Sequence, residues 1–287
     1  MTSISELINR IISYNDMLDN PHKPPHSSNL LHQLNKRETT RRLREFNDIC
    51  ESYLNFRDKG TQLSLDLDVY VNQLVDAINE YLDILKDINI NHQADFKSSV
   101  IPEMFFLILY KAIKSYSEDY YVSAQSDVPI ECMFDLQGGS RMMFKTKRLD
   151  MLVYKASKLI FDNNTIPFNI PLIAMEVKTN LDKNMMSGIE HSVTALKKTF
   201  PNSLYFVVTE YADMAIDKLN YASSSIDEIY ILRQQKRASV RKNMNLRNNI
   251  NPELVLDIAK QCIKLMENVH IIIPSTEVRM TTGKLIH

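Results

Sequence analysis

Segments with helical and with strand-like patterns are segregated along this chain, and their order constrains the fold more than any other feature. Apolar residues recur at the helical period from Leu67 to Leu85, with no Gly or Pro between them. Near the N-terminus, Ser3 and Glu6 have capping-box spacing ahead of another apolar run. The Pro- and His-rich stretch 21–28 is typical of a linker. We therefore expect residues 1–100 to form a helical region.

Beyond residue 150 the pattern changes to short runs that are rich in β-branched and aromatic residues. Such runs predict strands, and they occur at 151–154, 172–177, 204–208, 228–232 and 269–273. Helix-length segments follow at 184–199 and after Asn251-Pro252, and Pro102 suits the start of a helix that runs to about residue 115. This order predicts an α/β (α+β) domain at 101–287, with a mixed central sheet flanked by helices.

Composition excludes several classes of function. Five glycines in 287 residues cannot supply a dinucleotide fingerprint or a Walker loop. The apolar runs are far shorter than the roughly 18 to 20 residues that cross a bilayer, so we expect no membrane partner and a cytoplasmic location. The three cysteines are odd in number and widely spaced, which is typical of reduced, buried thiols. The seven histidines show no metal-ligand spacing, so any metal would be held by oxygen.

The formal net charge of -1 gives no overall attraction to nucleic acid, but the charge is unevenly placed. The segment from Arg233 to Arg247 carries Lys and Arg residues and no acid. A solvated loop explains such a run, and so does a segment that contacts phosphates.

The strand predicted around Ile173 to Lys178 carries the residues with the clearest chemical pattern. Because side chains alternate along a strand, Glu176 and Lys178 share one face. Asp150 begins the preceding strand, and pairing of the two strands would bring its carboxylate to Glu176. Two carboxylates and a backbone carbonyl suit Mg²⁺, and the neighbouring amine can orient an attacking water or stabilise charge on a phosphate.

A Glu-x-Lys triplet alone arises by chance in a chain of this composition, and a solvated ion pair also explains it. The wider arrangement is more specific: Asp150, then Glu176-Val-Lys178 at the end of an apolar strand, then a helix and another strand. This arrangement resembles the PD-(D/E)xK nuclease core, with Leu149 in place of the proline.

Further blocks resemble the type II restriction endonuclease family of BbvCI and Bpu10I. They are Ala174-Met-Glu-Val-Lys178, Asn184-Met185, Leu204-Tyr-Phe-Val-Val-Thr-Glu-Tyr211 and Ile226-Asp-Glu-Ile-Tyr-Ile-Leu-Arg233, and the similarity covers roughly residues 100 to 270. The resemblance implies Mg²⁺-dependent cleavage of duplex DNA, at a site related to CCTNAGC. Enzymes of this family cut asymmetric sites with two different subunits, so a second nuclease chain, identical or different, is an expected partner.

The resemblance also implies roles for single residues. Asp150, Glu176 and the Val177 carbonyl would hold the metal, and Lys178 would be the third catalytic residue. Glu103 aligns with a helix glutamate that supports the metal or its water, although a plain first-turn helix acid explains it nearly as well. Lys147 and Arg148 flank Asp150 and are candidates for phosphate contacts, and Asp135 is a reserve metal ligand.

A loop that leaves the sheet beside the active site often lies in a DNA groove in nucleases of this core. Arg233 can form a bidentate contact with guanine, and Gln234 or Gln235 with adenine. The remaining basic residues of the segment suit phosphates, namely Lys236, Arg237, Arg241 and Lys242. Two alternatives stay open: another PD-(D/E)xK nuclease of repair or recombination, and a DNA-binding partner that does not cleave.

Overall fold

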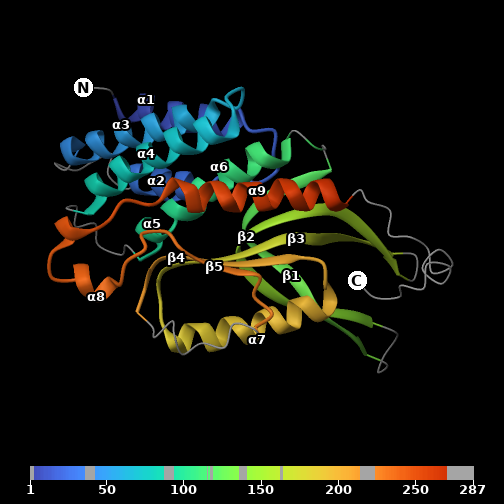
Figure 1. Ribbon diagram of the computed structural model, residues 1–287. Helices are drawn as coiled ribbons and strands as arrows, with labels where there is room; N and C mark the ends of the chain where they lie inside the picture. The colour runs from blue at the N-terminus through green and yellow to red at the C-terminus, as the bar shows by residue number, and fades with distance from the viewer. Residues whose placement is uncertain are drawn as a thin grey trace.

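A mixed sheet lies at the centre of the molecule (Figure 1). The computed structural model describes residues 3–35, 43–86, 94–114, 116, 119–135, 141–161, 164–213 and 224–269. In these residues five strands pair in the order of the chain: β1 (Tyr120–Asp135), β2 (Arg141–Phe161), β3 (Asn164–Leu181), β4 (Leu204–Ala212) and β5 (Glu228–Ile231). The first three are antiparallel, whereas β3, β4 and β5 are parallel. The predicted fold class is therefore confirmed.

Helices cover both faces of the sheet. On one face, α7 (Lys183–Thr199) joins β3 to β4, and Asp182 caps its N-terminus by accepting from the Met185 N–H. On the other face lie α6 (Val100–Lys114) and α9 (Pro252–Val269). Figure 1 shows the N-terminal helices stacked beyond them: α1 (Ile4–Asp16), α2 (Pro25–Asn35), α3 (Leu43–Thr61) and α4 (Leu67–Lys86). Three short elements complete the set: α5 (Ala94–Ser98), α8 (Arg237–Val240) and the 3-10 helix η3 (Met244–Leu246).

Four of the five predicted strand segments lie in β2, β3, β4 and β5, with the last of these ending one residue early. The prediction at 269–273 is wrong at Val269, which ends α9, and its other residues lie outside the described residues. The sequence pattern does not predict β1, because the polar residues around Ser126 interrupt the apolar alternation typical of a strand. It is an edge strand, where Pro129 is tolerated beside a shift in register.

The predicted linker at 21–28 is half wrong, because α2 begins within it at Pro25. Proline suits the first helical position, since its fixed φ matches the helix and its missing N–H would have had no intrahelical partner. His26 and Ser27, which made the stretch look polar, are buried in this helix. The helix expected from Pro102 begins two residues earlier, at Val100. Most of α6 is buried, as its apolar sequence on all sides requires.

The sheet separates two hydrophobic cores. The larger core extends from Leu7 in α1 through α6 and α9 to Met266, so the N-terminal helices and the sheet share it. The smaller core lies under α7. Along β3, Ile173 and Met175 belong to the larger core and Ala174 to the smaller one, which confirms the predicted alternation of side chains.

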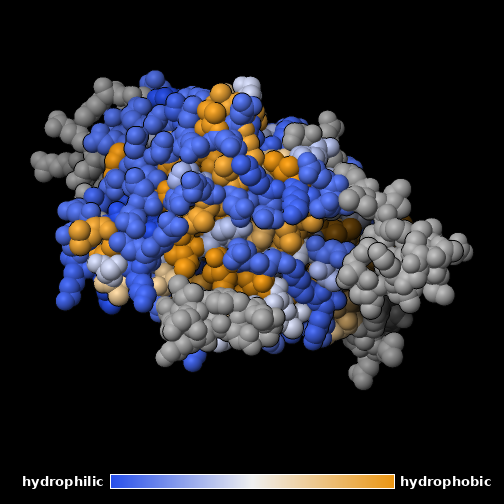
Figure 2. Space-filling model, in the orientation of Figure 1, coloured by the Kyte–Doolittle hydropathy of each residue, from blue (hydrophilic) through white to orange (hydrophobic). Residues whose placement is uncertain are grey.

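The surface of the molecule is largely polar over the helices, as Figure 2 shows. On the face drawn there, apolar residues gather between the upper helix layer and α7, over the edge of the sheet. Within the described part of the chain, no helix is long and apolar enough to span a membrane. Cys50 and Cys262 are buried free thiols, and burial raises the pKa of each to about 12. Cys132 is also free but exposed, contrary to the expectation that all three are buried.

Candidate active site

Three side chains predicted from the sequence meet where β2 pairs with β3. Met151 is the register partner of Met175, so Asp150 and Glu176 lie one residue further along the paired strands. The Lys178 ammonium lies between the two carboxylates, with Nζ 2.8 Å from Asp150 Oδ2 and 2.6 Å from Glu176 Oε2. The strand pairing thus brings together residues that are 26 positions apart in the chain.

Asp150 is held by three donors. Its Oδ2 accepts from the Val177 N–H at 2.8 Å as well as from Lys178, and its Oδ1 accepts from Gln125 Nε2 at 2.9 Å. Gln125 lies on β1, between the residues that pair with Leu149 and Met151, and its φ of 53° is in the left-handed region. Residues other than glycine rarely adopt this backbone conformation. No pattern in the sequence indicates that Gln125 belongs to the site.

A second ammonium lies against Glu176. Lys147 Nζ is 3.0 Å from Glu176 Oε1, and the Tyr205 hydroxyl donates to the same oxygen at 3.4 Å. The sequence suggested Lys147 only as a phosphate contact, and its pairing with Glu176 depends on the sheet register. The Glu176 side chain is 5% exposed, so protein partners rather than water stabilise the charge of this carboxylate.

Opposing effects act on the ionisation of the site. Burial by itself raises the pKa of Asp150, but the Lys178 ammonium and the donors at Val177 and Gln125 hold that pKa below its ordinary value. Burial lowers the pKa of Lys178, but the carboxylates of Asp150 and Glu176 outweigh it and the pKa is raised. At neutral pH the site therefore contains an ionised Asp150 and a protonated Lys178.

Asp150 lines a cleft of about 540 Å³ between the sheet and the helices. Val177, Ala124 and Gln125 line the sheet side. The opposite wall comes from the N-terminal region and the start of α6, namely Lys23, Pro25, Ser28, Asn29, Ser98, Ser99 and Pro102. The helical region therefore forms one side of the cleft that Asp150 lines.

The donor set fits a hard divalent cation. Asp150 and Glu176 already share one positive partner, Lys178, so their oxygens converge on a common point. Mg²⁺ is commonly held by one or two carboxylates while water completes its coordination. Within the described residues no cluster of three His, Cys, Asp or Glu side chains is present that could hold a metal. Asp135 is not a reserve ligand, because it ends β1 opposite Arg141, about 30 Å along β2 from Asp150 at the usual strand rise.

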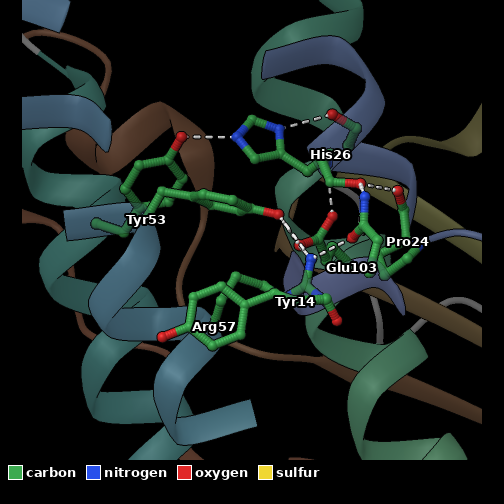
Figure 3. A network of polar contacts seen from close by, with 10 residues as sticks. Tyr14, Pro24, His26, Tyr53, Arg57 and Glu103 are labelled. Atoms are coloured by element: carbon green, nitrogen blue, oxygen red, sulfur yellow. Dashed lines mark hydrogen bonds and ion pairs between the residues drawn. The ribbon is translucent and has the colours of Figure 1, made fainter. Parts of the chain in front are cut away.

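Glu103 does not lie free at the site, contrary to the expectation that it supports a metal or its water. It is in the first turn of α6, as predicted, but both of its oxygens are occupied (Figure 3). Oε2 accepts from the Ser27 N–H at 2.8 Å, and Oε1 accepts from the Tyr53 hydroxyl at 2.6 Å and lies 3.3 Å from Arg57 Nη1. The side chains of Glu103 and Arg57 are both fully buried. Glu103 therefore joins α6 to α2 and α3.

His26 extends this buried network, as Figure 3 shows. Its Nδ1 is 2.9 Å from Ser99 Oγ, and its Nε2 is 2.6 Å from the Tyr81 hydroxyl. Ser99 donates its own proton to the Phe96 carbonyl, so Nδ1 must donate to Ser99 and Nε2 must accept from Tyr81. Burial lowers the pKa of His26 to about 3, so the imidazole is neutral.

Two of the residues assigned to base contacts instead hold the basic segment together. Arg233 is 1% exposed, with Nε 2.8 Å from Glu210 Oε2, and Nη1 donates to the Asn248 carbonyl. Gln235 donates to the Leu246 carbonyl at 2.9 Å and accepts from the Asn248 N–H at 3.0 Å. Neither side chain is free to bind a base in this structure. Gln234 is exposed, and its Oε1 lies 3.4 Å from Asn251 Nδ2, which is a long contact.

The other predicted cations are exposed. Lys236, Arg237, Arg241 and Lys242 all lie at the surface around α8. The side chain of Arg148 is 64% exposed and forms a bidentate pair with Asp127 on β1, with Nη2 3.2 Å from Oδ2 and Nε 3.3 Å from Oδ1. Because the pair is exposed, the Arg148 guanidinium is accessible to another anion.

Comparison with known proteins identifies the family. The model of the Bpu10I restriction endonuclease family matches residues 93–268, which include the whole sheet and the site. The chain belongs to the Bpu10I restriction endonuclease family. This family consists of enzymes that cleave DNA, and the predicted resemblance is thereby confirmed.

A solved structure of BbvCI shares the fold. A structure described as the native BbvCI A2B2 tetramer at low resolution is 24% identical, with a TM-score of 0.67, and the match covers 87% of this chain and 97% of that one. The type IIF restriction endonuclease Bse634I with cognate DNA is 13% identical, with a TM-score of 0.30, over 68% of this chain and 86% of that one. A search of curated proteins found no match.

Proposed function

We propose that this chain is a type II restriction endonuclease, or one subunit of such an enzyme, that hydrolyses duplex DNA at a short specific site with Mg²⁺. One observation carries the proposal: Asp150, Glu176 and Lys178 converge where β2 pairs with β3, beside the cleft that Asp150 lines, within a domain of the Bpu10I family. In this assignment residues 101–287 form the catalytic domain, and residues 1–100 contribute to DNA recognition or to dimerisation. A site related to CCTNAGC is the recognition sequence we propose.

Asp150, Glu176 and the Val177 carbonyl would hold the metal. Bound Mg²⁺ supplies charge neutralisation at the phosphate and lowers the pKa of a bound water. The donors at Gln125 and Val177 orient the Asp150 carboxylate. Little reorganisation of this carboxylate would therefore be needed if Mg²⁺ took the place of the Lys178 ammonium as its positive partner.

Lys178 is suited to stabilise charge rather than to accept a proton. Its pKa is raised by Asp150 and Glu176, so the amine stays protonated at neutral pH. As an ammonium it can donate to a non-bridging phosphate oxygen while water forms the new P–O bond and the bond to the leaving oxygen breaks. Lys147 and the exposed Arg148 extend the positive charge along β2 toward neighbouring phosphates.

A second nuclease chain is proposed as the partner in double-strand cleavage. Within the described residues this chain has one Asp150-Glu176-Lys178 site, and one site can hold one scissile phosphate at a time. The BbvCI structure is described as an A2B2 tetramer, which supports an assembly of two kinds of subunit as one arrangement for this chain. A homodimer is the other, because its two-fold axis can match that of a nearly palindromic site.

The test is digestion of a mixed-sequence plasmid library with Mg²⁺, followed by sequencing of the new ends. We expect cleavage at one short sequence. Asp150→Asn and Lys178→Ala should each abolish cleavage and leave specific binding measurable, because the first removes a metal ligand and the second a charge that stabilises the transition state. Lys183→Ala, a substitution of an exposed lysine on α7 outside the site, is the matched control. Cleavage by either site variant at the wild-type rate would refute the site assignment.

A further inference from the structure

A second hollow, of about 290 Å³, lies beside the cleft. Cations from separate parts of the fold line it, together with apolar residues such as Leu82, Leu85 and Val240. We name it the basic pocket. Lys86 ends α4, Lys97 lies in α5, and Arg237 and Arg241 begin and follow α8. Arg247 follows η3 and completes the set. Figure 1 shows α8 close to α5 on the left of the molecule.

The acidic groups near the basic pocket are already paired. Glu210 lines the pocket, but its Oε2 is 2.8 Å from Nε of the buried Arg233. Arg247 is paired with Asp83. In the described part of the chain, Arg237 and Arg241 form no salt bridge that would neutralise them. Cations held this close repel one another, and an anion in the pocket would relieve that repulsion.

The basic pocket and the active-site cleft are neighbours along the same strand. Val177 lines the cleft and Thr179 lines the pocket, and both lie on one face of β3, about 6.6 Å apart at the usual strand rise. The same holds for two consecutive residues of α5, since Lys97 lines the pocket and Ser98 lines the cleft. A chain of phosphates that enters the cleft would therefore pass the pocket within one or two nucleotides.

We propose that the basic pocket binds a DNA backbone phosphate that neighbours the scissile phosphate, an inference that rests on the proposed function. Arg237 and Arg241 supply planar guanidinium groups, which match phosphate oxygens in a bidentate manner. Lys86 and Lys97 add positive charge from the helical region, so this region and the catalytic domain would contact the same DNA strand. The pocket thereby fixes the position of the cleaved strand relative to Asp150 without reading its sequence.

Helix α7 offers a matched control. Lys183 and Lys198 are exposed cations on this helix that line neither the pocket nor the cleft. The pocket variant is Arg237→Gln with Arg241→Gln, and the control is Lys183→Gln with Lys198→Gln, so each removes two charges. Lys86→Gln tests the pocket from a different element, although it also removes the hydrogen bond of 3.3 Å from Lys86 Nζ to Asn245 Oδ1.

Binding to duplex DNA is measured in EDTA as a function of salt, so that it does not depend on cleavage. We expect the pocket variant to bind about tenfold more weakly than the control, with a salt slope lower by about 0.9 for each phosphate that the protein no longer neutralises. Lys86→Gln should change binding in the same direction. A second readout uses a neutral methylphosphonate at single positions around the cut site. At one such position, the methylphosphonate should weaken DNA binding by the wild-type chain and leave DNA binding by the pocket variant unchanged.

The outcomes separate this inference from the proposed function. If the wild-type chain cleaves DNA with Mg²⁺ but the pocket and control variants bind alike, the inference is overturned and the function stands. If the chain binds DNA through the pocket but makes no cut, the function is overturned instead. A wild-type chain that binds no duplex DNA overturns both.

Discussion

Replacing Glu103 distinguishes a structural role from a catalytic one. Glu103→Ala leaves the Arg57 guanidinium without its carboxylate in a site from which water is excluded, since both side chains are fully buried. Arg57 would keep its hydrogen bonds to Asn15 Oδ1 at 2.8 Å and the Tyr14 carbonyl at 3.1 Å, which are neutral acceptors. Removal of one partner of a buried pair costs about 3 to 5 kcal/mol. The Ser27 N–H and the Tyr53 hydroxyl also lose their acceptor.

The assay is urea denaturation of the purified chain at neutral pH, followed by circular dichroism. We expect the free energy of unfolding of Glu103→Ala to fall by about 3 to 5 kcal/mol, and that of Glu51→Ala by no more than about 1 kcal/mol. Glu51 is the matched control because its ion pair with Arg10, at 3.5 Å, is exposed.

The contrary result is specific. If Glu103→Ala unfolds like the wild type but loses cleavage, Glu103 acts at the metal or its water, and the interpretation of the buried network is wrong. If stability falls by the expected amount and the remaining folded protein cleaves at the wild-type rate per molecule, the network is structural.

Three further outcomes are expected. In the unfolded state His26 binds a proton below its ordinary pKa of about 6.5, whereas in the folded state it does so only below about 3. As the pH is lowered between these values, the free energy of unfolding should therefore fall by up to about 1.4 kcal/mol per pH unit. In urea titrations at successive pH values, His26→Gln should flatten this slope. Gln125→Gly should be at least as stable as Gln125→Ala because φ is positive there, while both should need more Mg²⁺ for half-maximal cleavage; an unchanged Mg²⁺ dependence would contradict the orienting role. Incubated without a partner on supercoiled plasmid with one site, this chain should accumulate open circles if its partner is a different subunit, and direct conversion to linear DNA would indicate a homodimer.

Local pattern was sufficient for much of the fold and for the centre of the site. The alternation along Ile173 to Lys178 placed Glu176 and Lys178 on one face, and the order of strands and helices indicated a mixed sheet flanked by helices. These features depend on contacts along one strand or helix, whose period is visible in the sequence.

The sequence alone determined the identity of the charged groups and their spacing along each element, and only the tertiary structure decided which of them meet. Gln125 reaches Asp150 through a left-handed backbone on an edge strand, and no local pattern encodes that conformation. Glu103 and Arg233 look like exposed functional residues in the sequence, but packing of α2 and α3 on α6 buries the first, and Glu210 and Asn248 enclose the second. The physical reason is that burial and ion pairing depend on contacts between residues distant in the chain, and these exist only after the helices pack on the sheet.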